Sequence, residues 1–530
     1  MTTPSPDPRY HHGPAAFVTA SGGPTAHPED RRLATALEDP VAADHAGAGA
    51  DRDVPVVRGR DRDLPAAPSR VLAVMCAGMF LVLLDVTIVN VALPSIGHGL
   101  RANTSMLQWV VDGYVVAIAG LLLAGGTIGD RAGHRRVLLA GFAVFGAASL
   151  VCAVAPTAGV LVAARVVQGV GGALLLPSTM AMIVDAFPDR RKQARALGMW
   201  AAVSSLALPL GPLLGGVLVG GFGWRPVFWI NVPLIMVAVL ATLLVVPARS
   251  TREATLSAAA LDTGGRERRR RGTGGSVDLP SLLAFVIGLG GLVFTVISVG
   301  HHASAPFLAA SASVTAGALA LALVSAKHAK FPILPLDLLR RPRFLAPNVI
   351  ALSMNLVFNG LLFVSMLYLQ DVLGFSPLRA GVTVLPMAIP LIALAPVSGR
   401  LTARFGPRPA VALGCVLATA GSLLLTQVRP AGALAWLLSG FTLLGCGAGL
   451  VTASVVAAVV RATPADRSGL ATGVSNTARQ IGTACGVAIF GAVAGTPSSP
   501  DFVPALHALA VVAAGLWAAA FLVAMLGIES

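Results

Sequence analysis

The chain has 530 residues, of which 55% are hydrophobic and only 12% carry a charge. Soluble globular domains carry about 25% charged residues, so this composition excludes an ordinary soluble protein and predicts an integral membrane protein. The net charge of +14 does not indicate nucleic-acid binding, because the basic residues lie in short loops between apolar stretches, where such residues orient membrane proteins.

The first element in chain order is a polar segment, residues 1–69, which is rich in Pro, Ala, Gly, Asp and Arg. It has no sustained apolar periodicity, and we expect it to be a disordered cytoplasmic tail. A signal peptide is not expected, because the first apolar run begins near Val71, which is too late, and is too long. A wrongly assigned start codon is the alternative interpretation of this segment.

The apolar stretches that follow predict fourteen transmembrane helices, since about 20 apolar residues cross a bilayer. A polar, arginine-rich segment interrupts them at residues 248–278, and we expect it to be a flexible cytoplasmic linker. The predicted spans are approximately 71–93, 107–128, 137–155, 159–184, 196–219, 227–247, 279–300, 305–326, 345–369, 380–401, 409–427, 432–460, 468–494 and 504–527.

The basic residues predict how these helices are oriented. With the N-terminus in the cytoplasm, the inner loops hold 24 Lys and Arg residues, and the outer loops hold four: Arg101, Arg225, Arg379 and Arg429. Cytoplasmic loops of membrane proteins carry the excess of Lys and Arg. Both termini are therefore expected on the cytoplasmic side of the cell membrane, with an even number of helices between them.

An internal repeat relates the first and last helices. Gly126–Arg135, after the second span, and Gly399–Arg408, after the tenth, share glycines and arginines at an offset of 273. Two matches at nearly one offset predict duplicated six-helix halves, as in many secondary transporters, although glycine-rich helices also align by chance. The second match, at an offset of 275, pairs Ala196, Gly198, Gly211 and Gly216 with Ala471, Gly473, Gly486 and Gly491.

The repeat and the spans together predict the domain organisation. The tail (1–69) precedes the first membrane unit, and the linker (248–278) separates it from the second. Spans seven and eight are predicted to be an inserted pair. The predicted units are an N-terminal six-helix half (70–247), two inserted helices (279–326), a cytoplasmic loop (327–344) and a C-terminal six-helix half (345–530).

Several motifs, in order and on the expected helices, resemble the major facilitator superfamily, specifically its branch of fourteen-span drug:proton antiporters. The resemblance covers about residues 70–527 and implies the all-α major facilitator fold, with two six-helix halves plus two inserted central helices. It also implies a transporter rather than an enzyme. The motifs are Leu84–Pro94 in the first span, the loop Gly126–Arg136, Arg165–Gly172 in the fourth span, the antiporter motif Gly211–Gly216 in the fifth, Trp224-Arg225 with Asn231–Pro233, and Arg479–Gly482.

The sequence departs from the family pattern at three positions. His134 stands where a basic Arg or Lys is usual, Ala207 replaces the leading glycine of the antiporter motif, and Ala403 replaces the acid of the second loop. The antiporter motif is therefore incomplete. The five cysteines are isolated within apolar spans, so neither a disulfide framework nor a metal site is expected, and no cofactor is expected.

Asp85, Arg165 and Asp112 are the candidates for proton coupling. Asp85 lies about 12 Å deep in the first span, where a carboxylate is costly and is a functional candidate by default. In the resembling family this acid is linked to protonation and substrate recognition. Arg165 lies at a similar depth in the fourth span, and we expect it to tune the protonation of Asp85 directly or through water and Gln168.

Each of these residues has an alternative role. Asp85 is otherwise a structural hydrogen-bond partner, and Arg165 otherwise snorkels or caps a neighbouring helix. Asp112 is either a second proton or cation group or a residue of the outer vestibule. Arg479, with Gln480 beside it, has a transport role or forms a structural link between helices.

Neutral amides are the candidates for contacts with the substrate. Asn348, Asn355 and Asn359 recur at spacings that place them on one face of the ninth span, and a polar stripe on a spanning helix faces protein or a wet cavity. The repeat places Asn359 approximately opposite Asp85, which predicts an asymmetric cavity with proton chemistry in the N-terminal half. Hydrogen bonding between helices is the alternative. Asn90 and Gln168 complete the predicted cavity set.

Two glycine-rich motifs are candidates for conformational roles. In the loop signature, Asp130 is expected to pair with a helix N-terminus or an arginine and latch one conformation. In the antiporter motif, small residues and a proline are expected to pack a kinked helix tightly and restrict proton leak, or simply to pack. The latch set is Gly126, Asp130, Arg131, Gly133 and Arg135, and the antiporter set is Gly211, Pro212, Gly215 and Gly216.

The predicted function is proton-coupled efflux of amphipathic drugs or antibiotics. No Gly-x-x-x-x-Gly-Lys-Ser/Thr sequence occurs, so an electrochemical gradient rather than ATP is the expected energy source. The alternative is a dedicated carrier of a metabolite, siderophore or lipid-like product, and a sensor that reuses the fold is a third class. The expected partners are a small-molecule substrate, protons and the lipid bilayer, without nucleic acid, and the chain is expected to act as a monomer.

Overall fold

The structure is a computed structural model in which the described residues form α-helices with short 3₁₀ and π segments and no β-strand. The predicted tail and the basic linker at 248–278 lie outside the described residues. The described residues are 68–246, 279–300, 303–328, 336–429, 434–463 and 468–529.

The first group of helices, here called the N-half, corresponds to the first six predicted spans. Two of these spans are broken into two helices each, at Leu206 and at Ile230. Pro209 and Pro233 have no N–H to donate four residues back, which explains both breaks. The helices are α1 (Pro68–Leu100), α2 (Thr104–Ala132), α3 (His134–Val154), α4 (Ala158–Ala186), α5 (Arg190–Ser205), α6 (Ala207–Phe222), α7 (Pro226–Trp229) and α8 (Asn231–Val245).

The inserted pair and the second group of helices, here called the C-half, account for the remaining spans. The inserted pair is α11 (Leu279–Gly300) and α12 (Ala305–His328). The C-half follows the one-turn helix α13 (Leu336–Leu339). It consists of α14 (Pro342–Leu367), η1 (Tyr368–Val372), α15 (Pro377–Thr383), α16 (Leu385–Phe405), α17 (Pro407–Leu424), η2 (Leu425–Gln427), α18 (Ala435–Arg461), α19 (Ser468–Ala494) and α20 (Phe502–Gly527).

Thirteen helical spans within the described residues are long and apolar enough to cross a membrane. The remaining long helix is α19, which has 27 residues and so is about 40 Å long. Its Asn476, Arg479 and Gln480 lower its mean hydropathy. It is long enough to span and packs against α14 and α2, so the structure is consistent with the predicted count of fourteen.

The two halves repeat one packing scheme. In the N-half α4 packs against α2 and α3, and in the C-half α18 packs against α16 and α17. The matched loop glycines even share a backbone conformation: Gly133 has φ +89° and Gly406 has φ +81°. Left-handed backbone of this kind favours glycine, which explains why the loop signature keeps one in both halves.

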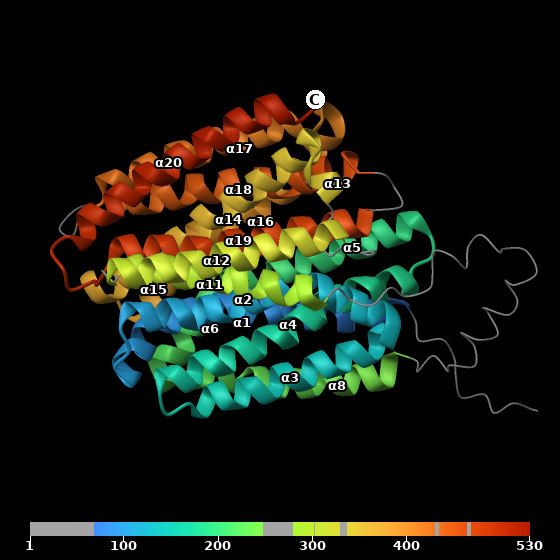
Figure 1. The fold of residues 1–530 in the computed structure, drawn as a ribbon, viewed down its shortest axis with the longest axis horizontal. Helices are drawn as coiled ribbons and strands as arrows, with labels where there is room; N and C mark the ends of the chain where they lie inside the picture. Colours follow the sequence, from blue (N-terminus) through green and yellow to red (C-terminus); the bar gives the residue numbers. More distant parts are fainter. Residues whose placement is uncertain are drawn as a thin grey trace, which may run out of the picture. The chain divides into compact units, whose positions relative to one another are not determined.

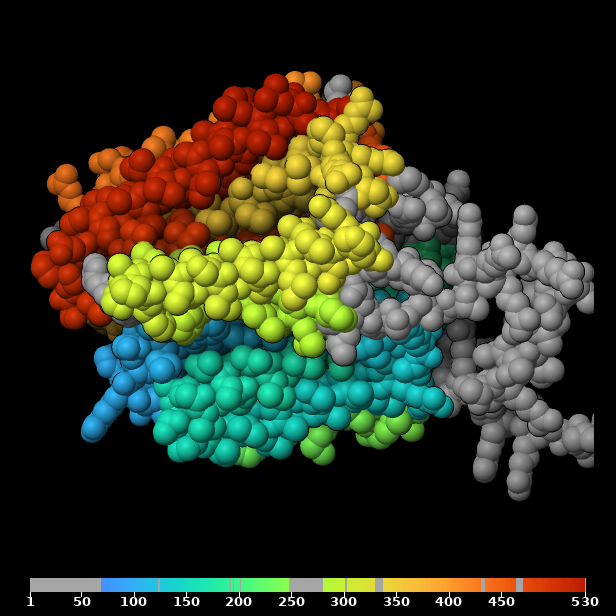
Figure 2. All heavy atoms as spheres, in the orientation of Figure 1, coloured from blue at the N-terminus to red at the C-terminus, as the bar shows by residue number. Residues whose placement is uncertain are grey.

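The halves meet toward the ends of the helices that the charge distribution assigns to the outside. There Gln370 of η1 donates a hydrogen bond to the Val91 carbonyl of α1 (3.0 Å), and α6 packs against α15. The inserted helix α11 packs against both α2 and α19. In Figures 1 and 2 the yellow-green pair α11 and α12 lies across the face where the blue-green N-half and the orange-red C-half adjoin.

Candidate functional site

A fully buried ion pair lies inside the N-half. The Arg165 guanidinium of α4 donates through its NH1 group to Oδ2 of Asp85 on α1, and the two side chains are 1% and 0% exposed. Both residues were candidates for proton coupling, and the structure brings them together. Removing one partner of a buried pair leaves an uncompensated charge, which costs about 3–5 kcal/mol. The pair is therefore a strong constraint between α1 and α4.

Neutral amides and a hydroxyl complete the network around the pair. Gln168 donates to Asp85 Oδ1 (2.9 Å) and to Ser149 Oγ (2.9 Å), and its own Oε1 accepts from Arg165 (2.7 Å). Asn231, the first residue of α8, also donates to Asp85 Oδ1 (2.7 Å). Both carboxylate oxygens of Asp85 thus have donors, from α4 and α8, which stabilise its charged form in this conformation.

The rest of the Arg165 side chain is held by α2. Its Nε donates to the carbonyl oxygen of Val110 (3.0 Å), and its guanidinium carbon lies 4.1 Å from the centroid of the Tyr114 ring. Stacking on an aromatic face and a fork of several donors are properties of arginine that lysine lacks. Five long helices of the N-half, α1, α2, α3, α4 and α8, therefore contribute to one polar network.

Asp112 lies in a contrasting environment on the opposite face of α2. It is fully buried, and neither carboxylate oxygen has a hydrogen-bond partner within the described residues. Cys485 of α19 lies close enough to the Asp112 carboxylate to interact with it electrostatically. One turn earlier, Gln108 donates to the carbonyl oxygens of Ala488 (2.9 Å) and Val487 (3.3 Å) of α19. Asp112 therefore lies at the contact between the halves and not in an open vestibule.

The predicted cavity amides are held mainly by their own helices. Asn90 is buried and donates to the Val86 carbonyl, and Asn355 donates to the Ala351 carbonyl. Asn359 donates to the Asn355 carbonyl and also to the Thr483 hydroxyl of α19 (3.1 Å). Asn355 and Asn359 remain partly exposed. The third stripe residue, Asn348, is buried and donates to the Phe344 carbonyl.

Arg479 has no carboxylate partner within the part of the chain that the structure describes. One of its terminal nitrogens donates to the Thr452 carbonyl oxygen of α18 (3.2 Å), and its buried Nε has no acceptor. The adjacent Gln480 is partly exposed. The C-half thus holds an arginine without a described counter-charge, whereas the N-half holds a neutralised pair.

An apolar groove runs along the N-half at the end assigned to the cytoplasm. It has a volume of about 570 Å³, within the range of small-molecule pockets. Apart from Ser69, its walls are apolar, and Met199 and Leu206 are about half exposed. The groove is formed by α1 and the α5–α6 segment, with lining residues Ser69, Leu72, Ala73, Cys76, Ala77, Phe80, Met199, Val203, Leu206 and Leu210.

In the loop signature, Asp130 contacts the first residue of α3. Asp130 lies 3.1 Å from the Nε2 atom of His134, the residue that departs from the family pattern, and the Asp130 side chain is 76% exposed. Arg135 donates through Nε to the Val246 carbonyl at the end of α8 (2.8 Å). Arg131 is exposed, and Gly126 lies against Pro177 of α4. In this conformation Asp130 contacts the start of α3 and no arginine within the described residues.

The antiporter motif lies between the two halves. A Cβ added to Gly215 would lie 3.0 Å from the Ile88 carbonyl of α1, and one added to Gly216 would lie 2.6 Å from Cα of Leu378 on α15. Gly211 packs on Thr87 in the same way, and the Pro212 carbonyl meets Gly381. Small residues allow this approach of backbones. The motif thus joins α6 to α1 and to the C-half at once.

The sequence-based prediction missed three residues of the network around Asp85, which are Tyr114, Ser149 and Asn231. It also missed Gln108 at the contact between α2 and α19. Asn231 was visible as part of a motif, but only the structure shows that its amide reaches Asp85. Ser149 and Tyr114 lie in apolar runs, where the sequence does not show that a single hydroxyl group has a functional partner.

Comparison with known proteins identifies the class of protein that this fold and site define. The sequence profile of the Major Facilitator Superfamily matches residues 75–487, so the chain belongs to this family of membrane transporters. It is therefore a multi-pass membrane protein that carries small molecules, and not an enzyme.

Among its relatives is the methylenomycin A resistance protein of Streptomyces coelicolor, 33% identical over 467 residues (87% of this chain and 93% of the relative). The tetracenomycin C resistance and export protein of Streptomyces glaucescens is 32% identical and aligns over 81% of this chain and 76% of its own length. The multidrug efflux pump LfrA of Mycolicibacterium smegmatis is 31% identical, with 80% of each chain covered.

Solved structures support the fold. A crystal structure of a mutant of the peptide transporter POT, in complex with alafosfalin, superposes with a TM-score of 0.58, at 14% identity, over 87% of this chain and 96% of that chain. The POT family transporter PepTSo gives the same TM-score at 15% identity, over 87% and 97%. At this identity the likeness concerns the fold alone.

Proposed function

We propose that this protein exports amphipathic drugs or antibiotics across the cytoplasmic membrane in exchange for protons. Three relatives at 31–33% identity bear the names of antibiotic-resistance and drug-efflux proteins, which supports the direction and the class of cargo. The observation that carries the proton coupling is the contrast between Asp85, which is paired with Arg165, and Asp112, which is buried without a partner among the described residues.

Asp112 is the group that we expect to hold a proton in this conformation. An isolated buried carboxylate charge costs several kcal/mol, whereas the neutral acid is tolerated. A proton that binds from outside would allow α2 to close on α19. Loss of that proton toward the cytoplasm would make the closed interface unfavourable and return the chain to the outward-open form.

Asp85 takes part in proton coupling by exchanging Arg165 for a proton as its partner. It can accept a proton only by giving up part of its interaction with Arg165, because the guanidinium already donates to its Oδ2 atom. Protonation is thereby linked to the relative position of α1 and α4. Of the two helices, α1 also packs against α14 and α15 of the C-half, which move relative to the N-half in an alternating-access cycle.

The described conformation supports an inward-facing state. Contacts between the halves lie toward the predicted outer ends, whereas the apolar groove lies at the inner ends of α1 and α5. A lipophilic cargo would enter there from the cytoplasm or the inner leaflet. We place both termini in the cytoplasm from the charge distribution, and we propose that a monomer in the lipid bilayer carries out the cycle without nucleic acid.

A drug-accumulation assay in a pump-deficient bacterium tests the proposal. Cells that express the protein should accumulate less ethidium, methylenomycin A or tetracenomycin C than cells with an empty vector, and an uncoupler should abolish the difference. Asp85→Asn should remove export at equal expression. Export that persists with the uncoupler, or in Asp85→Asn, would rule out proton coupling through this site.

A dedicated carrier is the second candidate, because two of the three relatives carry the name of a single antibiotic. The same assay separates the two functions. Export of one of the three probes alone favours the dedicated carrier, whereas export of ethidium together with an antibiotic favours the multidrug exporter.

A further inference from the structure

A basic pocket lies at the cytoplasmic end of the C-half, far from the network around Asp85. It has a volume of about 790 Å³ and is formed where α14 and α17 begin and α18 and α20 end. Among the lining residues that the structure describes, four are arginines, Arg340, Arg341, Arg343 and Arg461, and Glu529 is the only acid. The site therefore has an excess of positive charge that Glu529 offsets only in part.

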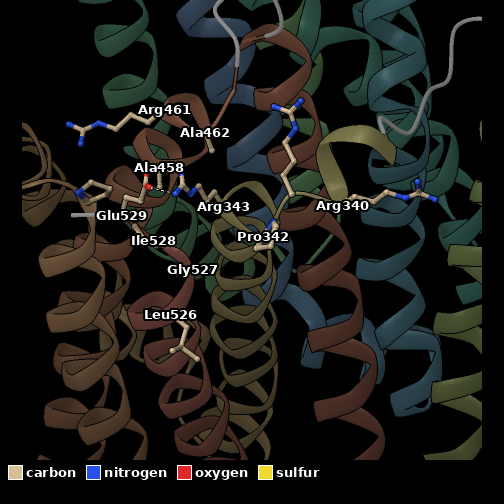
Figure 3. A pocket seen from close by; sticks show the side chains of 12 residues that line it. Arg340, Pro342, Arg343, Ala458, Arg461, Ala462, Leu526, Gly527, Ile528 and Glu529 are labelled. Carbon is tan, nitrogen blue, oxygen red and sulfur yellow. Dashed lines mark ion pairs between the residues drawn. The ribbon is translucent and has the colours of Figure 1, made fainter.

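The side chains divide this pocket into a polar centre and an apolar wall. Arg343 donates to Glu529 (2.7 Å), and both side chains are largely exposed. Figure 3 shows this pair in the left part of the view, with Arg461 above it and Arg340 extending away from it to the right. Leu526 of α20 is 90% exposed and borders the pocket below the charged groups.

Orientation of the helices by basic loops does not by itself explain this arrangement. Such orientation requires positive charge on one side of the membrane, but it requires no cavity. The N-half has an equivalent corner, where Arg135, the repeat partner of Arg408, caps the end of α8 through the Val246 carbonyl. In the C-half Arg408 instead approaches the Met525 sulfur (3.8 Å), and the corner remains hollow.

We propose that this pocket binds a phosphate-bearing anion, which enters either as the headgroup of an anionic phospholipid or as free phosphate. Arginine forks suit phosphate oxygens because they donate two parallel hydrogen bonds. Two helix N-termini and two C-termini meet at the pocket, so the helix dipoles offset one another and the arginines set the field. The exposed Leu526 beside the arginines suits an acyl chain, which supports the phospholipid as the source.

The test uses the full-length protein and measures binding of two probes. The phospholipid arm compares phosphatidylglycerol with phosphatidylcholine in nanodiscs by native mass spectrometry, and the soluble arm titrates inorganic phosphate in detergent by calorimetry. The pocket variant is Arg341→Gln/Arg343→Gln/Arg461→Gln. The matched control, Lys192→Gln/Arg195→Gln/Lys327→Gln, removes three charges on the same side of the membrane outside the pocket.

The pocket variant should bind phosphatidylglycerol about 100-fold more weakly, and the control variant should bind it as the native protein does. Glu529→Gln should strengthen binding, since it removes the carboxylate that competes for Arg343. If the protein binds inorganic phosphate but not phosphatidylglycerol, and this binding depends on the same arginines, the site is assigned to free phosphate. Equal losses in the pocket and control variants, or no binding of either probe, would overturn the proposal.

Discussion

Gln108 and Asp112 lie one helical turn apart on α2 and are both fully buried at α19, yet within the described residues only Gln108 has hydrogen-bond partners there. The Gln108 amide donates to two carbonyl oxygens of α19, and this contact does not depend on the protonation state of Asp112. The Asp112 carboxyl receives no hydrogen bond from the described part of the chain, so the interface tolerates it only when it is neutral. Under the proposed function, this pair of residues defines a contact whose stability depends on the proton bound at Asp112.

The first prediction concerns Asp112→Asn. The amide imitates the neutral acid in size and charge, so the variant should keep α2 closed on α19 at every pH. Under the proposed function, the closed form of the native protein binds one proton more than the open form, so acid favours closure and alkali favours opening. The measurement is the rate at which Gln370→Cys, a reporter at the contact of η1 with α1, reacts with a membrane-impermeant thiol reagent.

Thiolate formation alone raises the labelling rate with pH in both backgrounds. Beyond that common rise, the rate should increase from mildly acidic to mildly alkaline pH in the native background and should not in Asp112→Asn. Export should fall about tenfold or more, because the closed form no longer opens when a proton leaves. Asp112→Glu, which keeps an acid, is the control and should retain the pH dependence. The same pH profile in Asp112→Asn and in the native background would contradict the role given to Asp112.

The second prediction separates stability from transport at the ion pair. Asp85→Asn leaves Arg165 without a counter-charge and should lower the free energy of unfolding by about 3 kcal/mol. The double variant Asp85→Asn/Arg165→Gln removes both charges and should recover most of that loss. Neither variant should export drug. Thermal unfolding of the purified proteins and the accumulation assay provide the two measurements.

A double variant that recovers export as well as stability would show that the pair is only structural. Arg165→Lys is a useful comparison, because it keeps the charge but loses the fork that reaches Asp85, Gln168 and the Val110 carbonyl. It should fold and should export more slowly than the native protein.

The sequence predicted the helical fold well because hydropathy and basic loops report directly on the bilayer. The spans and the repeat follow from local chemistry, and Gly133 and Gly406 share their φ sign for the same reason. The helix breaks at Leu206 and Ile230 were not predicted. The predicted span 468–494 matches α19, which Asn476, Arg479 and Gln480 make less apolar and which packs against α14 and α2.

The candidate site was less predictable, because its geometry depends on which faces of separate helices meet. Equal depth of Asp85 and Arg165 allowed a contact between them but did not identify Asn231 or Tyr114 as further partners. Asp130 was expected to pair with an arginine or a helix N-terminus, and in this conformation it contacts His134, the first residue of α3. Conformation-dependent contacts of this kind leave no pattern in a single sequence.

The third prediction concerns Asn231→Leu. Leucine has a similar volume but cannot donate to Asp85 Oδ1, so one strong charge-assisted bond is lost, at about 1.5–3 kcal/mol. We expect lower thermal stability and a shift in the pH dependence of export, since the charged form of Asp85 loses a donor. Asn348→Leu, at a buried amide whose only described partner is the Phe344 carbonyl, is the matched control. It should affect stability without shifting the pH profile, and an identical shift in both variants would exclude a specific role for Asn231.

The last prediction uses two glycines one turn apart on α6. A Cβ on Gly216 would overlap the backbone at Leu378 of α15, whereas a Cβ on Gly220 would meet nothing within 4 Å. Gly216→Ala should therefore disfavour the closed contact between α6 and α15 by about 1–3 kcal/mol, the usual cost of overpacking. Gly220→Ala adds the same methyl group to the same helix and should leave the contact intact. With the Gln370→Cys reporter, Gly216→Ala should raise the labelling rate about tenfold and Gly220→Ala should not, because about 1.4 kcal/mol corresponds to a factor of ten. If both substitutions change labelling equally, helix propensity and not the close approach of the two halves explains the antiporter motif in this chain.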